Sequence, residues 1–166
     1  MTTEAAIEKT FAAVPLLERL SQRQRTRLAR RSTTRSYRRD AVIVREGDTA
    51  MAFYVVLSGR VRIEREGGPE AARNSPIEIR ELGPAGFFGE MGLIDDLPRS
   101  ATVVAVEPVE CALLAKWDFQ IELREDPEIA LALLPVLTQR IRDLEQRSKR
   151  PAKADVATVD RAAGGL

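Results

Sequence analysis

The centre of the chain is a series of short segments in which apolar and polar residues alternate, and this series limits the possible folds more than any other feature. The segments are AVIVREGD, FYVVLSGRVRIER, IEIRELG, ATVVAVEP and CALLA, and Gly, Pro and Asp residues separate them. Alternation with a period of two is typical of β-strands. Residues 46–48 and 58–60 predict turns, and residues 67–76, GGPEAARNSP, predict a loop. Many short strands at close spacing predict a sandwich or barrel, here a jelly roll.

The residues before these strands follow a helical period instead. Ile7, Phe11 and Val14 are spaced like one face of a short helix. Ser21 and Gln24 predict a capping box, in which each side chain accepts a hydrogen bond from the backbone N–H of the other residue, at the start of a second helix. We therefore expect N-terminal helices at about residues 3–31 and the β-roll at about 37–115.

A helical period returns after the last strand, and we expect C-terminal helices at about residues 116–146. The segment around Trp117 predicts a short helix, and Asp126 followed by Pro127 predicts the start of a longer one. Pro135 lies inside the apolar stripe of the longer helix, so we expect a kink there or a division into two helices. These elements define one domain at residues 1–146, and the composition of residues 147–166 predicts a disordered tail.

Composition excludes several classes of protein. The 166 residues suit one domain, and 26 basic against 25 acidic residues give no overall charge that favours nucleic acid or membrane. The chain has no histidine, which removes histidine-based acid–base chemistry and the histidine clusters of metal enzymes. It also has no apolar run long enough to span a membrane and no signal peptide, and its single cysteine, Cys111, predicts a buried inert thiol. A single cysteine suits a reducing compartment, so we expect a cytoplasmic protein.

The segment FFGEMGLIDDLPRSATV, residues 87–103, has the composition of an anion site with one added carboxylate. Its glycines allow close approach of the backbone, and residues 89–94 can form one helical turn whose free N–H groups attract an anion. Arg99 offers a planar fork that suits phosphate oxygens, and Ser100 adds a hydroxyl group. Glu90 would repel a phosphate, but it would accept a hydrogen bond from a ligand hydroxyl. A 3′,5′-cyclic nucleotide presents both a phosphate and a hydroxyl group. The 3′ and 5′ oxygens are part of its phosphate ring, so the ribose 2′-OH is its only free sugar hydroxyl.

The alternative for Glu90 and Arg99 is an ordinary ion pair across a surface turn, and the surrounding residues argue against it. The segment resembles the phosphate-binding cassette of the cyclic nucleotide-binding domain family. The resemblance rests on Phe88-Gly89-Glu90, the apolar pair at 93–94, and Pro98-Arg99-Ser100-Ala101 before a β-branched strand, and it extends over about residues 10–146. It implies an eight-stranded antiparallel β-roll, a double-stranded β-helix of jelly-roll type, with N-terminal helices and C-terminal B and C helices.

The resemblance also assigns roles within the cassette. It implies that Glu90 holds the 2′-OH, that Arg99 holds the exocyclic phosphate oxygens, and that Ser100 contacts the same phosphate through its hydroxyl and N–H. The N–H groups around Gly89 and Met91 complete the cradle. The remaining ligand-binding residues of the motif are Phe88 and Ala101.

The positions that would contact the base follow less directly from the sequence. An approximate alignment of the strands predicts that Ile63 and Ile79 contact the base. The alternative is that these two residues are ordinary core residues of the barrel. A residue of the C helix covers the base in this family, and Arg140, Ile141 and Leu144 are all candidates here.

The expected ligand is cyclic AMP, with cyclic GMP as the other possibility, and no other cofactor or metal is expected. The absence of an acid–base or nucleophile–base pair predicts binding without turnover, so we expect no enzyme. The abundance of Arg over Lys suggests a bacterial source, and a bacterial, stand-alone sensor favours cyclic AMP. The family mechanism implies that ligand binding shifts the position of the C helix.

The output of such a sensor is open. No recognition helix follows the C helix, so we expect no direct DNA binding and a so far unknown effector protein instead. Residues 19–39 contain arginines and no acidic residue, which predicts either a docking face for an acidic partner or a solvated helix face. The apolar stripe of the C helix could also form a homodimer.

Two other classes of function remain: a β-roll interaction module with an idle nucleotide pocket, and a cupin-like enzyme, which the lack of histidine opposes.

Overall fold

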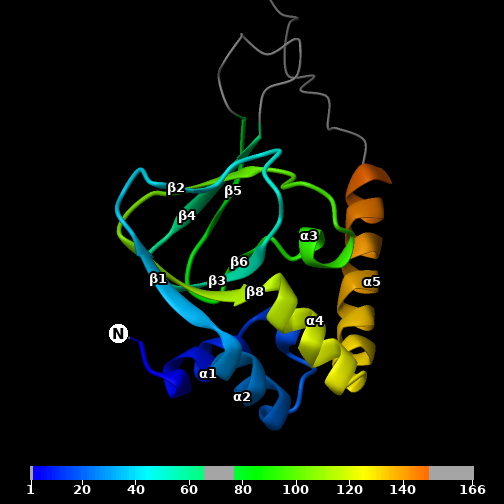
Figure 1. Cartoon of the computed structure of the whole chain (residues 1–166). Helices are drawn as coiled ribbons and strands as arrows, with labels where there is room; N and C mark the ends of the chain where they lie inside the picture. Colours follow the sequence, from blue (N-terminus) through cyan, green and yellow to red (C-terminus); the bar gives the residue numbers. More distant parts are fainter. Residues whose placement is uncertain (1, 66–76, 150–166) are drawn as a thin grey trace, which may run out of the picture.

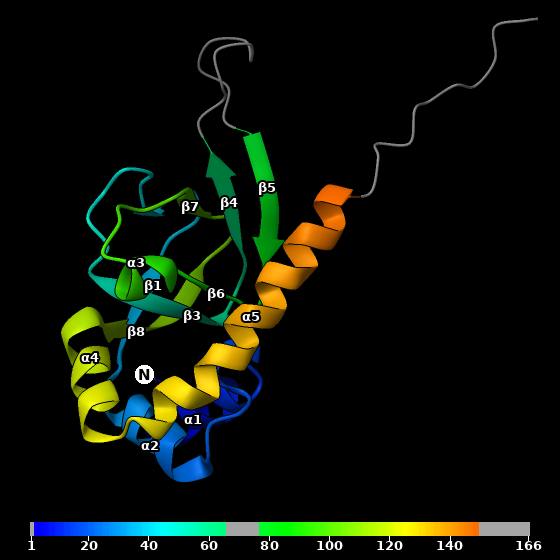
Figure 2. The same cartoon turned by 90° about the vertical axis from the view of Figure 1, so that its right-hand side faces the viewer.

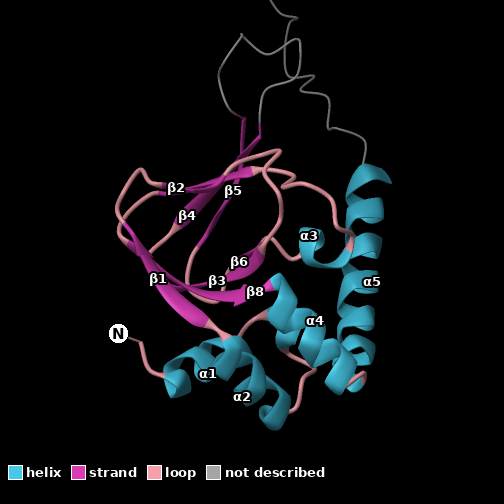
Figure 3. Cartoon of the chain, viewed as in Figure 1, coloured by secondary structure: helices cyan, strands magenta, loops and turns pink. Residues whose placement is uncertain are grey.

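The computed structural model describes residues 2–65 and 77–149. The loop predicted at 67–76 and the predicted tail from residue 150 onward lie outside these residues. The helical elements are α1 (Glu4–Ala12), η1 (Pro15–Leu17), α2 (Gln22–Arg31), α3 (Met91–Ile94), α4 (Lys116–Glu125) and α5 (Glu128–Lys149). The strands are β1 (Thr33–Tyr37), β2 (Val42–Val44), β3 (Ala52–Ser58), β4 (Val61–Arg65), β5 (Ile77–Leu82), β6 (Phe87–Phe88), β7 (Thr102–Ala105) and β8 (Val109–Ala115) (Figure 3).

The eight strands of the described part form two antiparallel sheets of four strands each. One sheet has the order β1-β8-β3-β6 and the other has the order β2-β7-β4-β5. Gly59 makes the turn from β3 to β4 with a φ of 78°, and a Cβ atom there would collide with the carbonyl of Pro108. The predicted eight-stranded antiparallel β-roll with flanking helices is confirmed.

Strand β3 shows how the layers of the molecule are stacked. Phe53 and Val55 belong to a buried cluster shared with the helices, whereas Tyr54 and Val56 belong to a second cluster between the two sheets. Successive side chains of a strand point to opposite faces, so the run FYVV is apolar throughout because both faces of β3 are covered. The sheet that contains β3 and β8 therefore lies between the other sheet and the helices (Figure 1).

Cys111 lies in β8 within the cluster between the sheets. Its side chain is completely buried, and burial raises the pKa of the thiol to about 12. The predicted buried thiol is confirmed, since the reactive thiolate form is strongly disfavoured.

The β-roll begins four residues earlier than expected, at Thr33 rather than near residue 37. Strand β1, with the sequence TTRSY, pairs with β8 from Thr33 opposite Leu113 to Tyr37 opposite Val109. It lies at the edge of its sheet and is largely exposed, so its side chains are mainly polar. The alternating apolar pattern that marks the other strands is therefore absent from β1.

A helix begins at each of the two predicted helix starts. Helix α2 begins directly after Ser21, and α5 begins at Glu128, one residue after the predicted first residue, Pro127. The capping box is formed: Ser21 N–H donates to Gln24 Oε1 at 2.9 Å and Gln24 N–H donates to Ser21 Oγ at 3.3 Å. Helix α5 begins at Glu128, and the carboxylate of Asp126 accepts a hydrogen bond from Gln24 Nε2 at 3.1 Å. The side chain predicted to cap α5 thus connects α5 to α2.

Helix α5 is a single helix of 22 residues that contains Pro135. Of the two predicted effects of this proline, a kink or a division into two helices, the division is wrong. Proline removes one N–H donor and leaves the carbonyl four residues earlier, on Leu131, without that partner. Leu131 and Pro135 are both exposed, so water can satisfy the carbonyl. Buried contacts of Ile129 and Leu133 hold the same turns against the core. The helix also ends at Lys149, three residues beyond the predicted end.

The arginine-rich segment is partly directed inward, which neither of the two interpretations of residues 19–39 anticipated. Glu122 of α4 is buried and its Oε1 accepts a hydrogen bond from Arg31 Nε at 2.5 Å. Arg27 Nη2 lies 2.8 Å from the other oxygen, Oε2, as an ion pair without hydrogen-bond geometry. Arg27 also lies 3.0 Å from Glu125. These contacts attach α2 to α4 and use two of the arginines internally.

Candidate functional site

The cassette segment connects β6 to β7 and contains the short helix α3, which lies beside α5 (Figures 1 and 2). Phe88 ends β6 and is buried, and Gly89 follows with a φ of 83°. A Cβ atom on Gly89 would collide with Nη1 of Arg99 and would lie 3.0 Å from the carbonyl oxygen of Ala52. Glycine is therefore required here for both its backbone conformation and its lack of a side chain.

Arg99 is nine residues from Glu90 in sequence and is held inside the fold, with 7% of its surface exposed. Its Nη1 donates to the carbonyl of Gly89 at 3.1 Å, and its Nη2 donates to the carbonyl of Ala52 at 2.7 Å. Its backbone is fixed as well, because its N–H donates to the carbonyl of Asp48 at 2.8 Å. A guanidinium group has five N–H donors, and these two side-chain bonds use two of them.

Burial lowers the pKa of Arg99 from its ordinary value, and the nearby Tyr54, Glu90 and Asp48 oppose that shift. An arginine remains protonated at neutral pH after such a shift. The site therefore presents a permanent, largely desolvated positive charge, which attracts an anion more strongly than an exposed charge does.

Glu90 is buried to the same extent, with 6% of its surface exposed. It precedes α3, and its carbonyl accepts a hydrogen bond from Leu93 N–H at 3.2 Å. It also borders a cavity of about 10 Å³ that is otherwise lined by apolar residues, which is far too small for a nucleotide. The pair does not lie on a surface turn, as the alternative interpretation required, because Glu90 and Arg99 are both buried. The side-chain hydrogen bonds of Arg99 go to backbone carbonyls.

The remaining cassette residues lie around this pair in different settings. Ser100 is exposed, and its carbonyl accepts a hydrogen bond from Arg65 Nε at 3.0 Å. Ala101 packs against the cluster between the sheets. Met91 is exposed as the first residue of α3.

The expected base-contacting residues are only partly described by the structure. Ile63 is buried in the cluster between the sheets and pairs with Val103 of β7, so it lies next to the end of the cassette. This position fits both contact with a base and an ordinary core role. Ile79 lies in β5, but its side chain is outside the described part of the chain, as are those of Arg140 and Leu144. Ile141 is exposed on α5.

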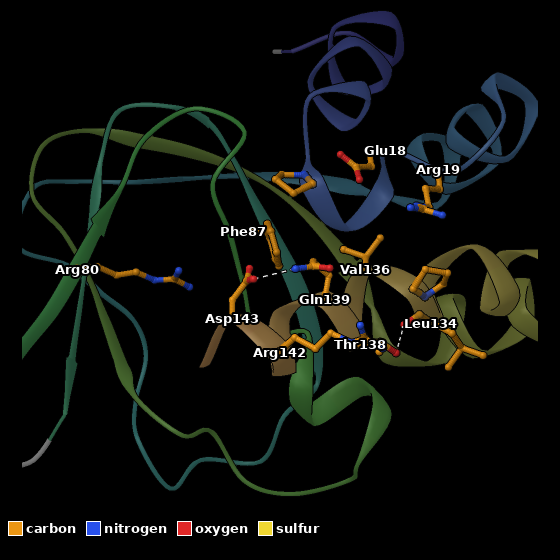
Figure 4. A pocket seen from close by; sticks show the side chains of 12 residues that line it. Glu18, Arg19, Arg80, Phe87, Leu134, Val136, Thr138, Gln139, Arg142 and Asp143 are labelled. Atoms are coloured by element: carbon orange, nitrogen blue, oxygen red, sulfur yellow. Dashed lines mark hydrogen bonds between the residues drawn. The ribbon is translucent and has the colours of Figure 1, made fainter. Parts of the chain in front are cut away.

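A separate groove of about 700 Å³ lies between η1, the β5–β6 region and α5 (Figure 4). Among its described lining residues, only Phe87 belongs to the segment 87–103, and Glu90 and Arg99 are not part of the lining. Its lining residues are Pro15, Glu18, Arg19, Arg80, Phe87, Leu134, Pro135, Val136, Thr138, Gln139, Arg142 and Asp143. Sequence reasoning missed it, because its residues come from segments that only the tertiary fold brings together.

Two further searches of residues 2–65 and 77–149 gave negative results. No group of three or more His, Cys, Asp or Glu side chains is placed to hold a metal ion there. Within those same ranges, no helix has the length and apolar character needed to cross a membrane.

The sequence pattern of the family described as "Cyclic nucleotide-binding domain" matches residues 34–126, more than half of the chain. A cAMP-dependent protein kinase regulatory subunit from Colletotrichum orbiculare is 35% identical over 113 residues, covering 68% of this chain and 27% of that protein. A cyclic AMP receptor protein from Thermus thermophilus is 37% identical over 113 residues, covering 67% of this chain and 50% of that protein. The chain thus matches half or less of the length of these relatives.

A comparison of structures agrees with the comparison of sequences. The crystal structure of the N-terminal domain of a transcriptional regulator from Streptomyces coelicolor A3(2) superimposes with a TM-score of 0.72 and 28% identity. The match covers 82% of this chain and 95% of that one.

Proposed function

Because the chain belongs to the cyclic nucleotide-binding domain family, we propose that it is a regulatory sensor that binds cyclic AMP at the segment between β6 and β7. The observation that carries this proposal is the burial of one arginine and one glutamate at the two ends of the cassette. The names of two relatives, a cyclic AMP receptor protein and a cAMP-dependent protein kinase regulatory subunit, support cyclic AMP as the ligand. One of these relatives is a receptor protein and the other is a regulatory subunit, which supports binding without turnover.

In this proposal each cassette group contacts a different part of the nucleotide. The remaining N–H groups of Arg99 bind the exocyclic phosphate oxygens, because a planar fork matches their geometry. Glu90 accepts a hydrogen bond from the ribose 2′-OH. Ser100 is exposed and supplies its hydroxyl to the phosphate, while the N–H groups near Gly89 and Met91 complete the cradle. Ile63 contacts the base.

Packing between α3 and the C-terminal helices supports transmission of the signal to the C helix, α5. Leu93 of α3 lies in the same buried cluster as Phe119 of α4 and Leu133 of α5. Lys116 Nζ, at the start of α4, also donates to the carbonyl of Gly92 at 3.2 Å. A ligand that moves or rigidifies α3 therefore changes the packing of α4 and α5, and it shifts an equilibrium between their positions. The changed face of α5 then signals to an effector protein.

Exposed apolar residues on α5 support a homodimer through this helix. Leu131, Leu134 and Ile141 are each more than half exposed. Together with Thr138 they follow the spacing of three and four residues that is typical of a coiled-coil seam. A second copy of the chain that packs along this stripe would remove these side chains from water.

Isothermal titration with cyclic AMP and cyclic GMP tests the proposed ligand. We expect cyclic AMP to bind in the micromolar range or tighter, and Arg99→Ala to weaken binding about 100-fold because a charged phosphate loses its partner. Arg38→Ala is the matched control, since Arg38 is an exposed arginine outside the cassette and its loss should leave binding unchanged. If neither nucleotide binds to folded wild-type protein, the alternative function as an interaction module with an idle pocket is favoured.

A further inference from the structure

Tyr54, on strand β3 outside the cassette, contacts the arginine of the proposed site. We propose that Tyr54 is a positioning residue that holds the guanidinium plane of Arg99 in the orientation needed for phosphate. The inference rests on the proposed function for its effect on ligand affinity, but the contact between the two side chains can be tested without any ligand.

The ring of Tyr54 is part of a stack that reaches across the sheet to the cassette. It lies parallel to the ring of Phe88, with 4.8 Å between the centroids and 5° between the planes. The two residues are direct partners in the β3–β6 pairing, so the backbone register fixes the stack. The Arg99 guanidinium carbon lies over the Tyr54 ring, 5.6 Å from its centroid, within the range of a cation–π interaction.

The hydrogen bonds of Arg99 end on both sides of this stack. One acceptor, the carbonyl of Gly89, belongs to the residue after Phe88, and the other, the carbonyl of Ala52, lies two residues before Tyr54 on β3. The two hydrogen bonds are both made at the Nη1–Nη2 edge of the guanidinium, so they still permit the plane of the group to tilt about that edge. The ring supplies a third contact, which opposes the tilt and fixes the direction in which the remaining N–H groups point.

The electrostatic setting gives the ring a second role. Arg99 is almost fully buried, and burying a cation is costly unless nearby groups compensate. An aromatic face carries partial negative charge, so Tyr54 partly compensates without hydrogen-bonding to Arg99. A carboxylate in that place would hold the guanidinium as an ion pair and would compete with a phosphate. An aromatic ring stabilises the charge and leaves its N–H groups to the ligand.

Three variants separate positioning from general packing. Tyr54→Phe keeps the ring and removes only the hydroxyl. Tyr54→Leu removes the ring and keeps an apolar side chain. Val56→Ala is the control, because Val56 lies two residues along the same strand, is completely buried in the same cluster and is outside the cassette. All three are first compared by circular dichroism and by their melting temperatures.

The first readout is the NMR signal of the Arg99 Nε–Hε group in protein without nucleotide. We expect an upfield ring-current shift of this proton in the wild type and in Tyr54→Phe. We expect loss of the shift in Tyr54→Leu, whereas Val56→Ala should retain it even if its melting temperature falls. The second readout is the cyclic AMP affinity. Tyr54→Leu should weaken binding about tenfold, and Tyr54→Phe and Val56→Ala should bind within about twofold of the wild type.

The outcomes distinguish this inference from the proposed function. An unchanged Hε signal in Tyr54→Leu overturns the inference, and so does equal weakening of cyclic AMP binding by Tyr54→Leu and Val56→Ala. If the wild-type protein binds neither cyclic nucleotide, the proposed function fails. The Hε signals of the same variants then decide only whether the Tyr54 ring contacts Arg99.

Discussion

Gly89 leaves no space for a side chain because the guanidinium of Arg99 occupies the position where a Cβ atom would lie. Gly89→Ala therefore displaces Arg99 from the Gly89 and Ala52 carbonyls, in addition to straining a backbone with a φ of 83°. We expect at least a tenfold loss of cyclic AMP affinity in titration calorimetry, and a loss of unfolding free energy above the ~1–2 kcal/mol typical of the left-handed region.

Gly47 is the control for backbone strain, and its own link to Arg99 is a hydrogen bond from its N–H to the Arg99 carbonyl at 2.9 Å. Its φ is 84°, but no atom lies within 4 Å of its Cβ position. Gly47→Ala therefore has the same backbone strain without the collision, and should lose about 1–2 kcal/mol of unfolding free energy. Equal nucleotide affinity in the two alanine variants would show that the position of Arg99 does not depend on the space at Gly89.

Glu122 should contribute far more to stability than its exposed neighbour Glu125, although both carboxylates lie near the same two arginines. Only 2% of the Glu122 side chain is exposed, and Arg27 and Arg31 contact its two oxygens. Glu122→Gln leaves two partly buried cations without their main counter-charge, so we expect a loss of about 3 kcal/mol in urea unfolding. The side chain of Glu125 is 54% exposed, and Glu125→Gln should cost less than about 1 kcal/mol. Similar losses for the two variants would contradict this account.

The buried thiol of Cys111 predicts a loss of stability at alkaline pH. Burial raises its folded-state pKa to about 12 from an ordinary value of 9.0. Between these two pH values the unfolded chain releases the proton and the folded chain retains it, so the contribution of Cys111 to stability falls as pH rises. The slope should approach about 1.4 kcal/mol per pH unit. Urea unfolding of the wild type and Cys111→Ala across this range isolates the effect, because the difference between them should be constant below pH 8 and should decrease above pH 9.

The cassette could be predicted from sequence because its chemistry is local. Gly89, Glu90 and Arg99 lie within a short segment, and each residue type is unusual enough there to indicate a role. The groups that hold Arg99 could not be predicted in the same way. The carbonyl of Ala52 has no sequence signature, and Tyr54 belongs to an apolar run that is equally well explained by core packing.

The ends of the β-roll and the arginine-rich segment show the same limit. Strand β1 was missed because an exposed edge strand needs no apolar alternation. The internal role of Arg27 and Arg31 was missed because Glu122 is about 90 residues away, and only the packing of α4 on α2 brings the charges together. Sequence periodicity predicts which face of an element is buried, but it does not predict which distant element covers that face.

The exposed stripe on α5 predicts that dimer formation depends on Leu134. This residue is 55% exposed between Leu131 and Ile141 and would lie near the centre of a two-fold α5–α5 contact. Leu134→Lys places two charges in that contact, so we expect the dimer dissociation constant to rise about 100-fold in sedimentation equilibrium. Met51→Lys is the control, because Met51 is an apolar residue that is 65% exposed directly before β3, and its change should leave the dimer intact. A wild-type protein that stays monomeric at all concentrations would overturn the proposed α5–α5 dimer.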